Sequence, residues 1–168
     1  MDDAALDELS TRELQAYGAL CLATFCGAAG IRHRAIAELI VHFVSLLSAD
    51  NLPDWEEAGG RLLLAGDAPP SVVVRDVPGN LLADFNALVE SAIEIGIIDM
   101  YGTGTQMPRR FALQCREILH KHGYAPPSAS DVTVQTRPLK GPWGRAASDE
   151  ASGRVLAACL RHLGDRRG

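Results

Sequence analysis

Apolar residues recur every three or four positions through most of the first 124 residues, which is the spacing of one buried helix face. The pattern predicts five helices there and a sixth near the end of the chain. We expect them at about residues 11–26, 34–49, 53–63, 81–100, 108–122 and 150–163. The predicted fold is all-α, a compact bundle of five to six helices with a loop-rich C-terminal third.

Residues typical of helix ends support these boundaries. Ser10 and Glu13 have the spacing of a capping box, in which each side chain binds a backbone N–H of the first turn. Pro53 and Pro108 suit a first helical turn, where no backbone donor is needed. The first helix is apolar on nearly all sides beyond residue 16, which is typical of a helix packed by neighbours all round.

Two stretches lack helical spacing. Residues 66–79 are rich in proline and glycine and predict a loop with one short extended piece at 72–74. Residues 125–148 are rich in Pro, Ser, Gly and Thr and predict a long loop or arm. The alternation at 131–136 could form a short strand, but a lone strand has no sheet to join. We expect residues 1–124 to be a helical core domain. Residues 125–168 would add a loop-rich arm and a C-terminal helix packed on the same domain.

Composition narrows the class of protein. The 168 residues are 47% hydrophobic and 22% charged, with a net charge of −5. That acidic balance argues against a nucleic-acid partner, which needs a concentrated basic surface. The longest uncharged stretch, 16–31, is too short and too interrupted by glycine to predict a membrane span. No signal-peptide pattern is seen, so we expect a cytoplasmic protein.

The four cysteines predict buried thiols, not a cofactor site. They are Cys21, Cys26, Cys115 and Cys159. None forms a C-x-x-C pair or has zinc-ligand spacing, so we expect neither a metal nor another cofactor. Four side chains could hold a metal if two helices were neighbours, namely Glu38, His42, Glu90 and Glu94. Their spacing differs from the Glu-x-x-His pattern of di-metal bundles, and solvated acids with an interfacial histidine explain them more simply.

Residues 102–110 contain the best candidate for chemistry. Two glycines, a helix start, Arg109 and Arg110 would suit an anion. Neither the Walker pattern nor G-x-G-x-x-G is present, however, and the preceding segment is helical. Pro108 also removes one backbone donor. The simpler interpretation is that Gly102 ends one helix and the next residues turn the chain.

The sequence therefore favours an interaction protein over an enzyme, because no motif of nucleophilic catalysis is present. We expect a protein-binding module that occludes one specific partner, for example a bacterial immunity or inhibitor protein that neutralises a basic toxin. The expected contact residues are Glu90, Glu94, Asp99, Tyr101, Arg109, Arg110 and Trp143. Trp143 either folds back on the bundle or anchors the partner, whereas Trp55 is expected in the core.

Two alternatives stay open at this point. One is a small helical enzyme or an anion- or metabolite-binding domain, with a pocket near Asp99 to Arg110. The other is a subunit whose glycine- and alanine-rich first helix packs in a homo-oligomer. All three hypotheses share one structural expectation, which is that apolar side chains fill the helix interfaces and no polar cluster assembles inside.

Overall fold

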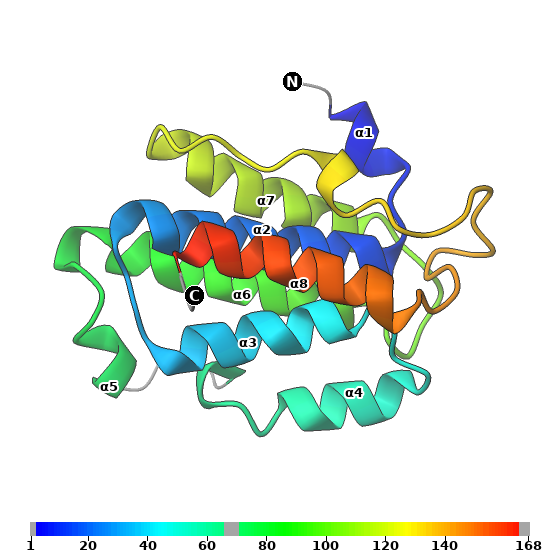
Figure 1. Ribbon diagram of the computed structural model, residues 1–168, viewed down its shortest axis with the longest axis horizontal. Helices are drawn as coiled ribbons and strands as arrows, with labels where there is room; N and C mark the ends of the chain where they lie inside the picture. The colour runs from blue at the N-terminus through cyan, green and yellow to red at the C-terminus, as the bar shows by residue number, and fades with distance from the viewer. Residues whose placement is uncertain (1–2, 66–70, 165–168) are drawn as a thin grey trace.

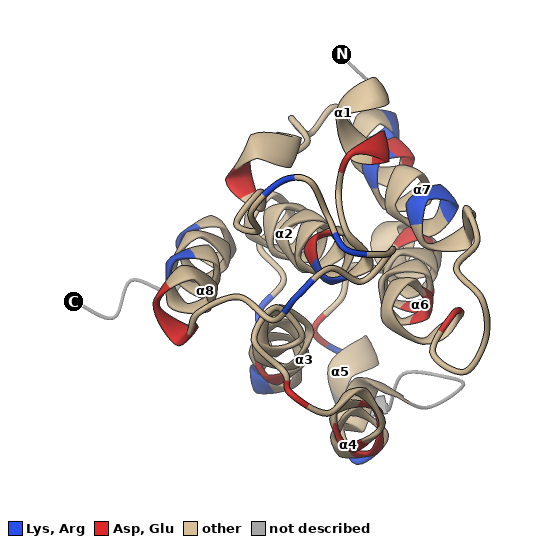
Figure 2. Cartoon of the chain, turned by 90° about the vertical axis from the view of Figure 1, so that its right-hand side faces the viewer, with Lys and Arg blue, Asp and Glu red and all other residues tan. Residues whose placement is uncertain are grey.

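Helix α2 (Thr11–Ala29) lies at the centre of the structure, and four other helices of three turns or more surround it. In the computed structural model, which describes residues 3–65 and 71–164, nearly every residue of α2 is buried. The surrounding helices are α3 (Arg34–Ser45), α6 (Leu82–Ile97), α7 (Met107–Lys121) and α8 (Asp149–Leu163). Figure 2, viewed along the bundle, shows α2 inside the ring that they form. The prediction of a helix packed on all sides is confirmed.

Two glycines of α2 explain how its neighbours come so close. A Cβ atom at Gly18 would lie 2.8 Å from Cδ1 of Ile95 on α6. At Gly27 it would lie 1.8 Å from the backbone oxygen of His162 on α8. Such distances leave no room for a side chain, so these positions set the spacing of α2 from two of its neighbours.

Shorter elements cover the outside of this bundle. They are α1 (Ala4–Asp7), α4 (Leu52–Gly59), η1 (Leu63–Ala65), α5 (Ser71–Val74), η2 (Gly79–Leu81) and η3 (Ala129–Asp131). The described residues are all helical or irregular, as the apolar spacing predicts, but they contain more helices than the five or six expected. None of these helices is long and apolar enough to cross a membrane.

The short extended piece considered at 72–74 is not found, whereas the loop preferred over a strand at 131–136 is confirmed. Residues 72–74 belong to the helical turn α5, while part of the predicted loop, 66–70, lies outside the described residues. The stretch 131–136 begins in the 3₁₀ turn η3 and continues as an irregular loop. The alternation of polar and apolar residues in this stretch therefore reflects a loop whose side chains are alternately exposed and more buried. The described residues contain no strand with which it could pair.

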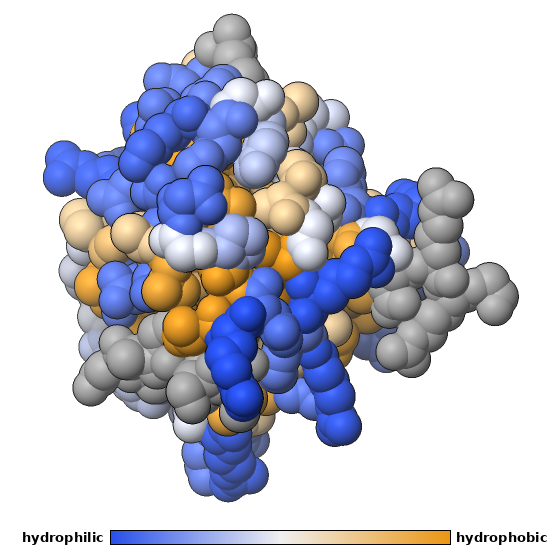
Figure 3. Space-filling view, turned by 90° about the vertical axis from the view of Figure 1, so that its left-hand side faces the viewer, coloured by the Kyte–Doolittle hydropathy of each residue, from blue (hydrophilic) through white to orange (hydrophobic). Residues whose placement is uncertain are grey.

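Residues 122–148 run along the outside of the bundle before α8 begins (Figure 1). Helix α8 begins close to the expected residue 150 and packs against α2 and α3, so only the first part of the C-terminal third is loop-rich. At the end of the bundle where α6 begins, apolar side chains are exposed and hydrophilic ones surround them (Figure 3). Leu81, the last residue of η2, and Leu82, the first of α6, are only partly buried.

Candidate binding surface

Helices α3, α4 and α6 border a pocket of about 160 Å³, which we call the α4 pocket. Its lining is mostly apolar, with His42 and Glu56 as its polar side chains. The lining residues are Leu39, His42, Phe43, Trp55, Glu56, Gly59, Gly60, Ala65, Ile93 and Ile97. A concave apolar surface with a few polar groups is typical of a binding site.

A stacked aromatic pair forms one wall of the α4 pocket. The rings of His42 and Trp55 lie 4.3 Å apart at an angle of 11°. The Trp55 indole Nε1 donates to the His42 backbone oxygen at 2.9 Å, which ties α4 to α3. Burial lowers the pKa of His42 below its ordinary value, so this imidazole stays neutral at pH 7. The wall is therefore uncharged and rigid.

Two glycines make room for these rings. A Cβ atom at Gly59 would lie 2.4 Å from His42 Nε2, and one at Gly96 would lie 2.8 Å from Trp55 Cη2. The indole thus packs directly on the backbone of α6, and the imidazole on that of α4. A larger residue at either position would have to displace a ring that forms the pocket wall.

The rim of the α4 pocket combines acidic and apolar side chains. Tyr101, just after α6, is 75% exposed, and its hydroxyl donates to Glu56 Oε2 at 2.5 Å. This hydrogen bond raises the pKa of Tyr101. The pocket is lined on the α6 side by Ile93 and Ile97; elsewhere on this part of the chain Glu90 is exposed, Glu94 is partly exposed, and Ile98 is 42% exposed. Acidic positions on both α4 and α6 are visible in Figure 2.

Asp99, an expected contact residue, lies inside the structure instead. It is only 4% exposed. Its carboxylate accepts from the Thr105 backbone N–H at 2.7 Å and from the Thr105 hydroxyl at 2.8 Å. The Thr105 oxygen in turn accepts from the Met107 N–H at 3.1 Å. The loop therefore uses these donors for its own hydrogen bonds, so they are not free to bind an anion.

Arg109 and Arg110 have different surroundings. Arg109 pairs with Asp7 of α1, and 29% of its side chain is exposed. Arg110 is exposed. The arrangement supports the interpretation of residues 102–110 as a corner between two helices, and it does not bring these arginines together with Asp99 as a site.

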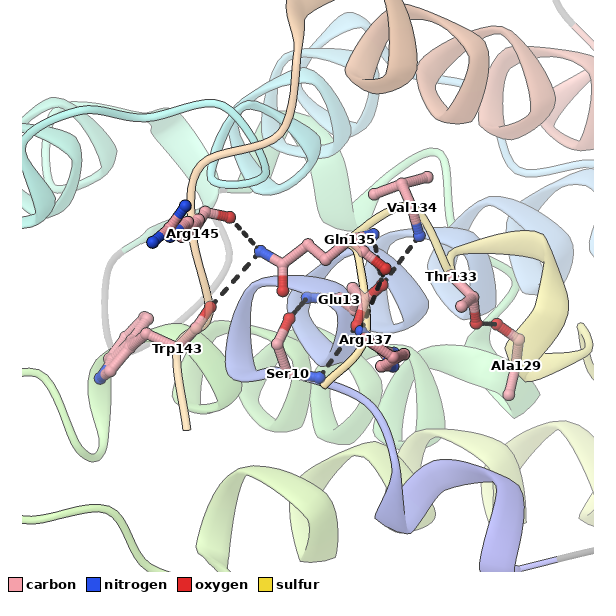
Figure 4. Close-up of polar contacts among 9 residues, drawn as sticks. All are labelled: Ser10, Glu13, Ala129, Thr133, Val134, Gln135, Arg137, Trp143 and Arg145. Carbon is pink, nitrogen blue, oxygen red and sulfur yellow. Dashed lines mark hydrogen bonds and ion pairs between the residues drawn. The ribbon is translucent and has the colours of Figure 1, made fainter. Parts of the chain in front are cut away.

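Trp143 is half-buried and packs against the hydrophobic core, so it folds back on the bundle. Its loop is held by Gln135, whose side-chain amide donates to the backbone oxygens of Trp143 and Arg145. Figure 4 shows these contacts beside a second cluster, centred on Glu13. Trp143 is therefore part of the arm's own packing.

Glu13 is completely buried at the start of α2. Its carboxylate accepts from the backbone N–H groups of Ser10 at 3.0 Å, Val134 at 2.8 Å and Gln135 at 3.1 Å. It also pairs with the guanidinium of Arg137 at 2.7 Å. Burial alone would raise the pKa of Glu13, but these donors together hold it below its ordinary value. We call this cluster the Glu13 anchor, because it fixes residues 134–137 to α2.

The neighbouring Arg12 is a second buried charge. Its guanidinium donates to the backbone oxygens of Leu46 at 2.6 Å and Ala49 at 2.8 Å, just beyond the end of α3. Burial lowers its pKa. The expectation of an interior without polar clusters is thus wrong at this end of α2. The capping-box pattern predicted the hydrogen bonds between Ser10 and Glu13. No local pattern predicted the contacts of Glu13 with residues more than 120 positions away.

The four side chains considered for a metal do not converge. Glu38 pairs with Arg34 on its own helix at 2.7 Å, whereas His42 stacks on Trp55. Within residues 3–65 and 71–164, no group of three or more His, Cys, Asp or Glu side chains is arranged to hold a metal ion. The four cysteines are buried thiols, as predicted.

Comparison with known proteins adds no constraint on this surface. Neither a protein-family model, nor a curated protein, nor a solved structure shows a significant match to the chain. Its function is therefore inferred from the geometry of the α4 pocket and of its rim.

Proposed function

We propose that this chain is a protein-binding module that acts by occluding one specific protein partner. The α4 pocket with its acidic rim would be the docking surface. The observation that carries the proposal is the open apolar pocket beside Tyr101, a large side chain that is 75% exposed. Exposed aromatic residues around an apolar pocket are typical of the centre of an interface.

The charge of the rim determines the chemistry of the partner. Glu56, Glu90 and Glu94 lie on the two helices that border the pocket, and the chain has a net charge of −5. Basic surfaces associate faster with such a rim, because opposite charges steer the encounter. We therefore expect a basic segment that inserts one apolar side chain into the pocket.

The role we favour is that of a bacterial immunity or inhibitor protein, which masks a basic toxin in the cytoplasm. Masking requires only a rigid complementary surface. Of the residues expected from the sequence, we assign Glu90, Glu94 and Tyr101 to this surface. Arg110 is exposed near the start of α7, whereas Asp99, Arg109 and Trp143 contact other parts of the chain.

The experiment uses wild-type protein as bait and identifies a captured partner by mass spectrometry. The charge-reversal variant Glu90→Lys/Glu94→Lys is then compared with Glu117→Lys/Glu150→Lys, which changes the net charge equally at exposed positions of α7 and α8. We expect association at low salt to slow by roughly tenfold in the first variant and less in the second, because steering depends on local charge. Equal rates in the two variants would reject this docking surface.

The apolar half of the surface needs a separate variant. Gly60 borders the pocket with φ −62°, and a Cβ atom there would meet its nearest heavy atom at an ordinary 3.5 Å. Gly60→Leu therefore adds a side chain at the pocket without backbone strain. Gly153→Leu on α8 is the matched control, since its Cβ would meet no heavy atom of the described chain within 4 Å. We expect faster dissociation of the partner from Gly60→Leu alone.

A further inference from the structure

A larger cavity, of about 570 Å³, lies between two segments of the loop-rich arm, residues 134–140 and 145–148. We call it the arm cleft. Its volume is typical of a small-molecule site, and it shares no residue with the α4 pocket. The lining residues are Val134, Gln135, Thr136, Arg137, Pro138, Leu139, Lys140, Arg145, Ala146, Ala147 and Ser148.

Both walls of the arm cleft are fixed to the bundle and to each other. The side-chain amide of Gln135 donates to the Arg145 backbone oxygen, which joins the two walls (Figure 4). The Glu13 anchor holds the first wall to α2. The Ala147 N–H donates to the Leu47 oxygen at 2.7 Å, which holds the second wall just beyond α3. The cleft is therefore preformed, so a ligand would not have to order these segments.

The charges of the arm cleft are all positive, although the chain has a net charge of −5. Among the described residues, its charged lining consists of Arg137, Lys140 and Arg145. Arg137 is already paired with Glu13. Lys140 and Arg145 are exposed, and within the described chain neither forms an ion pair. Two positive charges therefore remain available to a ligand, one on each wall.

Two hydroxyls add neutral donors to the arm cleft. The Ser148 oxygen accepts from the Ala151 N–H at 3.1 Å, so the Ser148 proton is free to donate. The Thr136 hydroxyl has no hydrogen-bond partner within residues 3–65 and 71–164. Asp149 and Glu150, which begin α8, lie outside the lining, and the rest of the lining is mostly apolar. The cleft thus combines donors with an apolar surface and contains no carboxylate.

We propose that the arm cleft binds a small organic phosphate, and that Lys140 and Arg145 bind the phosphate group. Cations on opposite walls suit a phosphate dianion, because its oxygens accept hydrogen bonds in several directions at once. The hydroxyls of Thr136 and Ser148 donate to the oxygens that the cations leave free. The apolar lining contacts the organic part of the ligand. This site is independent of the proposed function.

The test uses phenyl phosphate as the probe and phenyl sulfate as the control ligand, which has a similar shape and one negative charge less. Calorimetric titration of the full chain at about pH 8, where a phosphate monoester is fully ionised, gives the dissociation constants. Amide resonances of ¹⁵N-labelled protein locate the bound probe. We expect saturable binding of phenyl phosphate, with shifts centred on residues 134–148, and roughly tenfold weaker binding of phenyl sulfate.

Charge-matched variants assign the binding to the cleft. Lys140→Gln/Arg145→Gln should weaken binding by roughly tenfold or more, because both cationic donors are gone. Arg110→Gln/Arg161→Gln removes the same charge at exposed positions of α7 and α8 and should change affinity by less than about twofold. Lys140→Arg/Arg145→Lys keeps both charges and should retain most of the affinity.

Each outcome decides the proposal. Equal losses in the two glutamine variants would overturn it, because net charge would then explain the binding. Phenyl phosphate that fails to saturate, shifts centred outside residues 134–148, or equal affinity for phenyl sulfate would overturn it as well. Inorganic phosphate tests the organic part: weaker binding than phenyl phosphate supports contact with the apolar lining, and equal binding contradicts it.

Discussion

The Glu13 anchor and the α4 pocket place polar groups in opposite situations. In the anchor, a fully buried carboxylate receives three backbone donors and one guanidinium. In the pocket, a neutral imidazole stacks on an indole, and the neighbouring Glu56 and Tyr101 lie at the surface. The anchor has no unused bonding capacity for a partner, whereas the pocket rim keeps its charges in contact with solvent.

This difference separates stabilising residues from binding residues. Buried charges are costly unless they are paired, so the hydrogen bonds of a paired one hold segments of the chain together. Partly exposed charges around an apolar pocket contribute little to folding, but they remain accessible for association. Variants in the Glu13 anchor should therefore change the free energy of unfolding, and variants at the α4 pocket should change the rates of partner association and dissociation. The size of each change tests this distinction.

The largest effect is expected for Glu13→Ala. It leaves the N–H groups of Val134 and Gln135 and the guanidinium of Arg137 without their acceptor, which should lower the free energy of unfolding by about 3 kcal/mol. Urea denaturation of both proteins measures the difference. Glu8→Ala, at an exposed position of the preceding turn, serves as the control and should be near neutral. Similar losses in both variants would contradict the anchor.

The same pair of proteins gives a pH test. The pKa of Glu13 is lower in the folded protein than in the unfolded chain, so unfolding of the wild type takes up protons in acid. The contribution of Glu13 is therefore complete above its unfolded pKa of about 4.3 and is lost as the pH falls through the lower folded pKa. The stability difference between wild type and Glu13→Ala should narrow below that pH. A constant difference across the acid range would contradict the stated cause.

An intermediate effect is expected for Asp99→Ala. The substitution removes the acceptor of the Thr105 N–H and hydroxyl, which should cost about 1–2 kcal/mol because the exposed loop can rebind water. Asp99→Asn keeps one acceptor oxygen and should lose less. Association with a captured partner should be unchanged in both variants at equal folded fraction. A specific loss of binding would place this loop in the interface after all.

The helices were predictable because their signals are local. Ser10, Glu13 and Pro108 mark helix starts that the structure confirms, whereas α2 runs three residues beyond its expected end, to a left-handed Gly30 at φ 70°. The apolar faces followed from spacing alone. Position 72–74 was misassigned because three consecutive valines favour strands by propensity, and propensity is weaker than the packing that buries Val73.

The candidate site was harder to predict, because it depends on contacts between distant segments. Nothing near His42 indicates that Trp55 stacks on it, and the role of Gly59 and Gly96 appears only when a Cβ is placed against these rings. Conversely, the glycines at 102 and 104 allowed an anion-binding loop, yet the Thr105 N–H and hydroxyl in this loop donate to Asp99 instead. The residue types indicated which groups could bind a ligand. Only the tertiary packing showed which of these groups already bind another part of the chain.

The smallest effect on folding, and the sharpest contrast with Glu13, is expected for Tyr101→Phe. The variant removes only the hydroxyl that donates to Glu56, at a side chain that is 75% exposed. Water replaces that hydrogen bond, so the melting temperature should change by less than about 1 °C. In the proposed complex, however, the same hydroxyl becomes desolvated, and its loss leaves Glu56 without that donor. Dissociation of the captured partner should therefore accelerate in Tyr101→Phe while stability stays constant, and the reverse result would assign Tyr101 to the fold instead of the interface.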